Sequence, residues 1–156
     1  MNESCGLKGF FKIDHYDKAG NLIESVATPN VITVDGMNEV AELIGTDTTS
    51  TATAFDYIAV GTGTTAAAKA QTELVTEAST AGLGRATGTG TIVTDGDAGN
   101  TFQLVKSFSP TSSFAVTESG VLNAAADGEM LCRQTFSAIN VTDGDTLTIT
   151  WKVKVS

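Results

Sequence analysis

The strongest local candidate for chemistry is a glycine-rich turn at residues 61–66 (GTGTTA), which follows the apolar run at residues 57–60. Its spacing fits the permissive form of the dinucleotide-binding turn, in which glycines let the backbone approach a pyrophosphate. That function also requires a helix that starts at the loop and a second strand that ends in an acidic residue. Residues 79–84 instead form a small-residue stretch, and no such strand follows. We therefore interpret the turn as a strand end followed by a surface loop.

Two acidic turns contain oxygen ligands at alternate positions, as a calcium site requires. Asp95, Asp97 and Asn100 resemble the first half of an EF-hand loop, but Lys106 stands where the bidentate glutamate would be. The same segment is typical of a tight hairpin turn, and residues 143–145 (DGD) have the same character. We interpret both as turns, and whether the turn at residues 95–100 binds a cation stays open.

Histidine and cysteine provide few ligands or nucleophiles. His15 is the one histidine, with Asp14 and Asp17 close in sequence, and we expect it to be a half-exposed strand residue. Cys5 and Cys132 are the two cysteines, too few for a structural zinc site without other ligands. The sequence favours two free thiols in a reducing cytoplasm, although their pairing stays open.

Charge and composition narrow the function further. The chain has 156 residues, and its 18 acidic and 9 basic residues give a formal charge of −9. This balance argues against binding to nucleic acid or to an anionic membrane surface. The N-terminus lacks the basic and apolar regions of a signal peptide, and no apolar run is long enough to span a membrane. No local spacing marks a pair of catalytic carboxylates. We predict no catalytic, cofactor-binding or metal-binding residues, and no enzyme activity.

The elements that must position these residues are mostly strands. Apolar residues alternate from Leu147 to Val155, which predicts a half-buried strand with Trp151 on its inner face. Other predicted strands, each bounded by turns, are at residues 9–15, 22–27, 57–60, 85–94, 101–108, 113–118, 120–123 and 129–136. The first two flank a turn at residues 17–21, and the hairpin turn at residues 95–100 joins 85–94 to 101–108.

Helix is scarce. Residues 35–45 place Met37, Val40, Ala41 and Ile44 on one face, with Asp35 as N-cap and Gly45 as the stop signal. A second helical turn is predicted at residues 71–77. These elements predict a mainly β protein, an antiparallel β-sandwich or jelly-roll-like domain with one or two short helices.

One β-rich domain is expected over residues 9–156, preceded by an N-terminal arm at residues 1–8. Phe10 and Phe11 are adjacent in sequence, so in a strand one of them must face away from its own core.

The order of several weak motifs resembles that of small virion structural proteins of tailed bacteriophages. The resemblance runs from about Asn30 to the end of the chain, and each motif is weak alone. The motifs are residues 30–33 with 35–38, 57–65, 73–74 with 77, 85–87, 117–123, 131–136 and 145–151.

The resemblance implies a non-enzymatic assembly component and brings no catalytic residues with it. We expect a capsid decoration (cement) protein on the exterior of the virion, assembled in the host cytoplasm, with the major capsid protein as partner and a homotrimer as its state. Two alternatives remain: a component of the tail tip, baseplate or fibre, and, from another class, a carbohydrate-binding β-sandwich or a hydrolase acting on the cell envelope.

Overall fold

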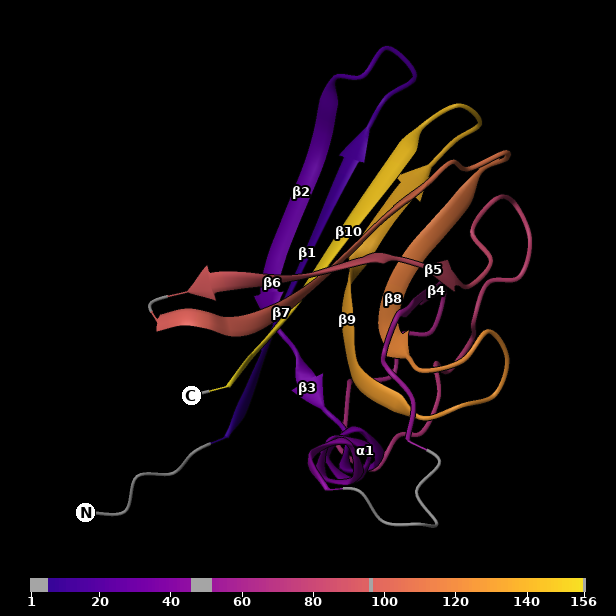
Figure 1. The fold of residues 1–156 in the computed structure, drawn as a ribbon. Helices are drawn as coiled ribbons and strands as arrows, with labels where there is room; N and C mark the ends of the chain where they lie inside the picture. Colours follow the sequence, from indigo (N-terminus) through magenta and orange to yellow (C-terminus); the bar gives the residue numbers. More distant parts are fainter. Residues whose placement is uncertain (1–5, 46–51, 96, 156) are drawn as a thin grey trace.

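The computed structural model describes residues 6–45, 52–95 and 97–155, and it is a sandwich of two antiparallel sheets (Figure 1). Each sheet has five strands, in the order β2-β1-β10-β7-β6 for the first and β3-β9-β8-β4-β5 for the second. The predicted β-sandwich class is therefore confirmed. The strands are β1 (Leu7–Tyr16), β2 (Leu22–Pro29), β3 (Val31–Ile32), β4 (Tyr57–Gly61), β5 (Ala86–Thr87), β6 (Thr89–Asp95), β7 (Asp97–Phe108), β8 (Phe114–Leu122), β9 (Met130–Val141) and β10 (Thr146–Val155).

Strands β1 and β10 lie side by side within the first sheet. Apolar and polar residues alternate along both strands. Phe11 lies opposite Trp151 in the pairing register, and both side chains are buried. Phe10 points outward and is 54% exposed, as expected for one of two adjacent phenylalanines in a strand. Leu7 and Lys8, which belong to the predicted arm, are paired with Val155 and Lys154 and are therefore part of β1.

The core forms where the two sheets face each other. Trp151 of the first sheet packs against Phe11, with ring centroids 4.7 Å apart, and Phe11 stacks on Phe136 of the second sheet at 5.1 Å. The Trp151 indole N–H donates to the Ser119 hydroxyl at 3.3 Å, and that hydroxyl donates to the carbonyl of Ala59. The buried indole nitrogen therefore has a hydrogen-bond partner.

Two predicted turns are present, and the third prediction is confirmed as a hairpin although residues 97–100 of the expected turn belong to β7. The β1–β2 turn is fixed by the Asp17 carboxylate, which accepts from the backbone N–H of Ala19 and Asn21, and β6 pairs with β7 as the predicted hairpin. The second turn, at residues 142–145, contains Gly144 at a φ of 88°. Strands β9 and β10 on either side of this turn lie in different sheets, so the turn connects the two layers.

Strand β8 is continuous, although two separate segments were expected. It runs from Phe114 to Leu122, with an irregularity between Val116 and Glu118. Residues 116–122 are buried on both faces. One face lies in the sandwich core, and on the other Leu74, from the long connection between β4 and β5, packs with Ala59, Leu122 and Met130. A polar side chain on the outer face of β8 is thus enclosed by protein.

Helix α1 (Val34–Ile44) confirms one predicted helix, but its N-cap and its buried face differ from the prediction. The N-cap is Thr33, whose hydroxyl accepts from the Gly36 N–H at 3.0 Å, and not Asp35. Gly36 packs so closely on β9 that a Cβ at this position would overlap the backbone of Leu131. Of the four residues predicted to share a face, Val40 packs against the core, whereas Met37, Ala41 and Ile44 are exposed, Ile44 by 84%.

The helical turn predicted at residues 71–77 is wrong. This segment is irregular, and Glu77 forms an isolated bridge with Gly61 at the end of β4. The backbone N–H groups of Val75 and Thr76 donate to the Glu118 carboxylate. A tertiary contact therefore replaces the weak helical preference of this threonine-containing segment.

Replacing Trp151 with alanine should lower the free energy of unfolding by about 3–5 kcal/mol, because a fully buried aromatic group is removed from the contact between the sheets. Urea denaturation measures this change. Val155→Ala, at the 53% exposed end of the same strand, is the matched control and should change stability by less than about 0.5 kcal/mol. Equal effects of the two substitutions would contradict the packing described.

Candidate functional site

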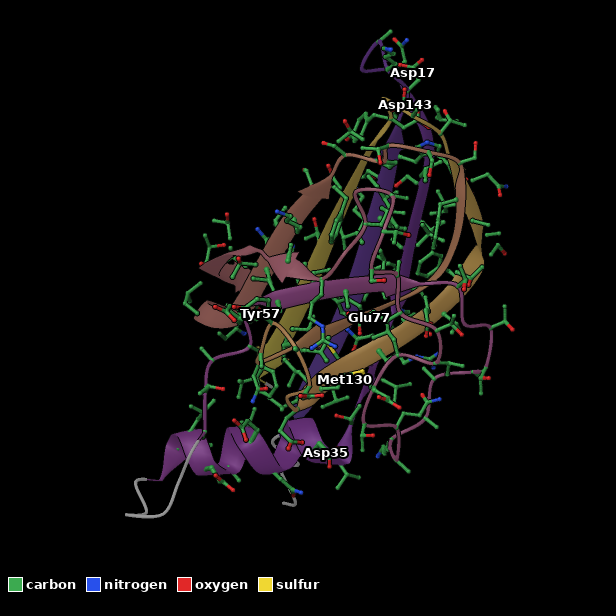
Figure 2. The ribbon with its side chains drawn as sticks, turned by 90° about the vertical axis from the view of Figure 1, so that its right-hand side faces the viewer. Asp17, Asp35, Tyr57, Glu77, Met130 and Asp143 are labelled. Carbon is green, nitrogen blue, oxygen red and sulfur yellow. The ribbon has the colours of Figure 1, made fainter. Side chains whose placement is uncertain are left out.

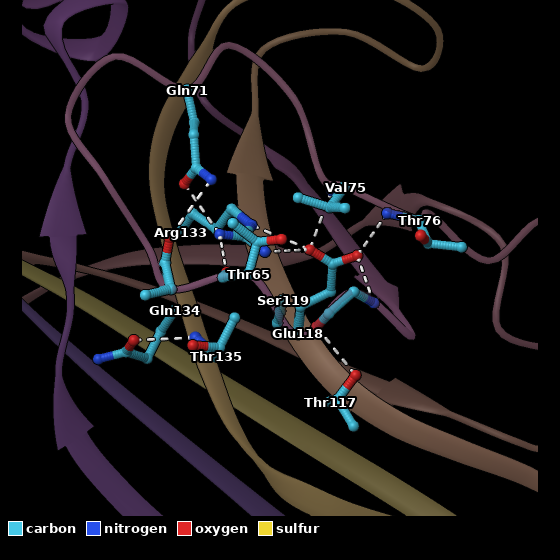
Figure 3. Close-up of polar contacts among 12 residues, drawn as sticks. Thr65, Gln71, Val75, Thr76, Thr117, Glu118, Ser119, Arg133, Gln134 and Thr135 are labelled. Atoms are coloured by element: carbon cyan, nitrogen blue, oxygen red, sulfur yellow. Dashed lines mark hydrogen bonds and ion pairs between the residues drawn. The ribbon is translucent and has the colours of Figure 1, made fainter.

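A buried ion pair that makes several further hydrogen bonds lies beneath the glycine-rich turn at residues 61–66 (Figure 3). Glu118 on β8 and Arg133 on β9 are both fully buried and form an ion pair, with Arg133 Nη2 2.6 Å and Nε 2.9 Å from Glu118 Oε2. The remaining guanidinium nitrogen, Nη1, donates to the carbonyl oxygen of Thr65 at 2.9 Å and to Gln71 Oε1 at 2.8 Å. The arginine is thereby paired with a carboxylate and with the loop above it.

The Glu118 carboxylate also holds the backbone of the covering connection. It accepts from the N–H groups of Gly63 at 2.9 Å, Val75 at 3.0 Å and Thr76 at 2.7 Å. Burial alone would raise the pKa of Glu118. The hydrogen bonds that it accepts, first from Thr76 and then from Arg133, outweigh burial and hold that pKa below its ordinary value of 4.5. Glu118 is therefore ionised at neutral pH.

This geometry explains the glycines of residues 61–66. A Cβ on Gly61 would overlap the carbonyl oxygen of Thr76, and a Cβ on Gly63 would overlap the Glu118 carboxylate. The glycines permit the backbone to approach an internal carboxylate, and no helix begins at the loop. The predicted strand end followed by a loop is confirmed, and the loop N–H of Gly63 is directed at Glu118.

His15 is buried, so the expectation of a half-exposed histidine is wrong. It is 3% exposed, and its Nε2 lies 2.9 Å from Asp145 Oδ2. The same carboxylate accepts from the backbone N–H of Thr142 at 2.8 Å. The hydrogen bonds from His15 and Thr142 lower the pKa of Asp145. The pair attaches the turn between β9 and β10 to β1 of the first sheet.

The acidic neighbours of His15 in sequence have other partners. Asp14 accepts from Lys12 Nζ at 2.7 Å and from the Ser25 hydroxyl at 2.6 Å. Asp17 remains within the β1–β2 turn, where it bonds Ala19 and Asn21. The structure thus brings His15 to Asp145, which lies 130 residues away.

The other candidate residues are placed as follows. Cys132 is a buried free thiol whose pKa is raised by burial, while Cys5 lies outside the described residues. The side chains of Asp95 and Asp97 also lie outside the description, and Asp143 is exposed in its turn. Within residues 6–45, 52–95 and 97–155, no three His, Cys, Asp or Glu side chains converge on a point that could hold a metal ion.

An apolar groove lies at the end of the sandwich, between α1 and the β6–β7 hairpin. Its volume is about 850 Å³, and most of its lining residues are apolar. Ile92 of β6, which lines it, is 66% exposed, and Leu43 of α1 is 50% exposed. Figure 2 shows α1 lying across this end of the molecule. The lining residues are Leu7, Val40, Leu43, Ala54, Phe55, Asp56, Gly90, Thr91, Ile92, Asn100, Phe102, Leu131, Val153 and Val155.

Sequence patterns did not identify this groove because its residues resemble those of a core. The alternation along β6 places Ile92 on the inner face of the first sheet, opposite Phe102. The second sheet does not extend over that position, so the inner face stays exposed. Leu43 likewise is 50% exposed, on a helix whose inward contacts are made by Gly36, Glu39 and Val40.

Comparison of the chain with protein-family models, with curated proteins and with solved structures gave no match. In the part of the chain that the structure describes, no helix has the length and apolar character needed to cross a membrane.

Replacing Arg133 with methionine should lower the free energy of unfolding by about 3–5 kcal/mol, because the Glu118 carboxylate remains buried without its cation. Chemical denaturation followed by tryptophan fluorescence measures the change. Lys152→Met, a partly exposed cation on β10, is the control and should cost less than about 1 kcal/mol. Similar stabilities of the two variants would show that the pair does not hold the fold.

Stability should fall on acidification because of Glu118. Its pKa is lowered in the folded state, so its contribution is present above the ordinary value of 4.5 and is lost as pH falls through the folded value. We expect the Glu118→Gln variant to be less stable than the unmodified protein at neutral pH. As the pH is lowered from neutral, the variant should lose less stability than the unmodified protein. Urea unfolding across the acidic range tests this, and an unchanged slope would contradict it.

Proposed function

We propose that the protein is a non-enzymatic structural component of a tailed-phage virion: a capsid decoration protein that binds the outside of the head. The observation that carries the assembly role is the apolar groove between α1 and the β6–β7 hairpin. The phage context comes from the order of motifs along the chain. The proposed partner of the groove is an apolar segment of the major capsid protein.

The exposed apolar surface at this end supports a binding role. Soluble monomers rarely expose large contiguous apolar patches, and those that they do expose commonly mark interaction sites. Here Leu43, Ile44 and Ile92 are each at least half exposed. Covering such side chains releases about 25 cal/mol for each Å² of apolar surface removed from water. A partner segment seated in the groove would gain affinity chiefly from this burial.

The lining chemistry favours a protein partner over a sugar. Carbohydrate sites need polar groups placed to fix hydroxyls, whereas most residues lining this groove are aliphatic or aromatic, with Asp56, Thr91 and Asn100 as the polar members. Trp151, the one tryptophan, is 1% exposed and serves the core, so it offers no stacking platform. These observations support an assembly component rather than the carbohydrate-binding or envelope-hydrolase alternative.

Decoration would stabilise the head by linkage. A protein that binds the assembled lattice and not the separated subunits shifts the equilibrium toward assembly, by an amount that grows with its free concentration. A tail-tip, baseplate or fibre component could use the same groove against a different neighbour. Electron microscopy of particles carrying a labelled chain separates the two, since decoration predicts many copies on the head and the alternative predicts a few at the tail.

Leu43→Glu should reduce binding to emptied, expanded heads at least tenfold, because it places a charge in the apolar groove. Co-sedimentation with the heads measures binding, and circular dichroism checks the fold. Ala41→Glu, an exposed position on the same helix, is the matched control and should bind normally. Failure of the unmodified protein to bind heads, or equal binding by both variants, would contradict the proposal.

A further inference from the structure

Lysines gather on one face of this acidic protein. The outward side chains of β1 and β10 include Lys8 and Lys12 on β1 and Lys152 and Lys154 on β10. Asp14 is the one acidic residue among the outward positions of these two strands, and Lys12 and Ser25 hold its carboxylate. Four of the nine basic residues of the chain are therefore on this face, and one of them, Lys12, is paired with Asp14. We call the surface formed by these four lysines and Phe10 the lysine face.

The pairing register brings the charges of the lysine face together. Lys8 lies directly opposite Lys154, so two positively charged side chains are neighbours on this face. Phe10 lies opposite Lys152 and is 54% exposed, so an aromatic ring stands among the cations. Beside it is a shallow hollow of about 320 Å³, lined in part by Phe10, Lys12 and Lys152. Partners that supply carboxylates and apolar contacts would complement such a surface.

A complementary surface exists on the same chain. Asp35 of α1 is partly exposed and Glu42 of α1 is exposed, and exposed Glu129 lies immediately before β9, against which α1 packs. The third helix carboxylate, Glu39, is buried and accepts from the Thr53 N–H and from Asn123 Nδ2, so it is not part of this surface. Burial raises the pKa of Glu129, and the three helix carboxylates raise it further, which indicates that the four groups are near one another. The last turn of α1 contains no basic residue. We call this surface the acidic edge.

The positions of the two surfaces determine how copies would meet. The lysine face is the outer face of the first sheet, whereas the acidic edge is formed by α1 and the loop before β9 of the second sheet (Figure 1). A two-fold symmetric contact through either surface would place like charges together. Opposite charges meet only when the lysine face of one copy contacts the acidic edge of another. Unless both surfaces of each copy engage the same neighbour, such a contact is heterologous and forms a ring or an open chain.

We propose that copies of this chain associate head to tail, with the lysine face of one copy on the acidic edge of the next. The proposal concerns a second copy as partner and does not depend on the role in a virion. Phe10 lies within the contact and contributes apolar burial, while the charges set orientation and partner choice. Because the contact is largely ionic, added salt weakens it.

Native mass spectrometry and analytical ultracentrifugation of the purified protein test this directly. We expect oligomers at low ionic strength that dissociate toward the 16.0 kDa monomer as salt is raised. A monomer at every protein and salt concentration would overturn the proposal. Because no heads are present in this experiment, its result is separate from that of the head-binding assay.

Paired charge reversals identify the surfaces. Lys8→Glu with Lys152→Glu, or Glu42→Lys with Glu129→Lys, should each abolish association, and mixing the two double variants should restore it because their surfaces are again complementary. Lys18→Glu with Lys106→Glu makes the same change of charge outside the lysine face and should associate normally. Circular dichroism verifies folding of each variant. Oligomers that persist in both double variants, or no reassociation on mixing, would overturn the assignment.

Discussion

The buried ion pair between Glu118 and Arg133 is the interaction on which the outer layer of the second sheet depends. Neither side chain reaches solvent, and together they hold backbone groups from Gly63, Thr65, Val75 and Thr76. The long connection between β4 and β5 has little regular structure of its own. Its path over β8 is therefore set by a carboxylate and a guanidinium that cannot be left unpaired at that depth.

The two sheets differ in whether their outer faces are covered by other parts of the chain. One sheet has its outer face closed by the β4–β5 connection, with Leu74 packed against Leu122 and Met130. The first sheet leaves its outer face to solvent, with Phe10 and the lysines of β1 and β10 on it. At one end the inner face of β6 extends beyond the second sheet and borders the groove. Two surfaces are thus left available for binding: the outer face of the first sheet, and the groove beside β6 where the second sheet ends.

Much of the fold was predictable because the strands alternate clearly. The pattern from Leu147 to Val153 identifies β10 and its buried face, and the turn residues at 17–21 and 95–100 identify two hairpins. Which strands pair across long separations was not predictable, because alternation records burial and not neighbours. The turn at residues 142–145 illustrates this, since a tight turn joins strands of different sheets.

The site was harder to predict because its contacts are long-range. Glu118 and Arg133 lie 15 residues apart on neighbouring strands, and nothing local distinguishes them from surface charges. His15 finds Asp145 only through the fold. For α1, the helical spacing placed Met37, Val40 and Ile44 on one face, but Val40 packs against the core while Met37 and Ile44 are exposed. Exposed apolar residues of this kind cannot be told from core residues by periodicity alone.

Hydrogen–deuterium exchange, measured with and without emptied, expanded heads, tests the central claim that the open end of the sandwich is the assembly surface. The account predicts added amide protection in α1 and in the β6–β7 hairpin, with the β1–β2 turn at the far end unchanged. No change in α1 and the hairpin, or protection confined to the β1–β2 turn, would contradict it.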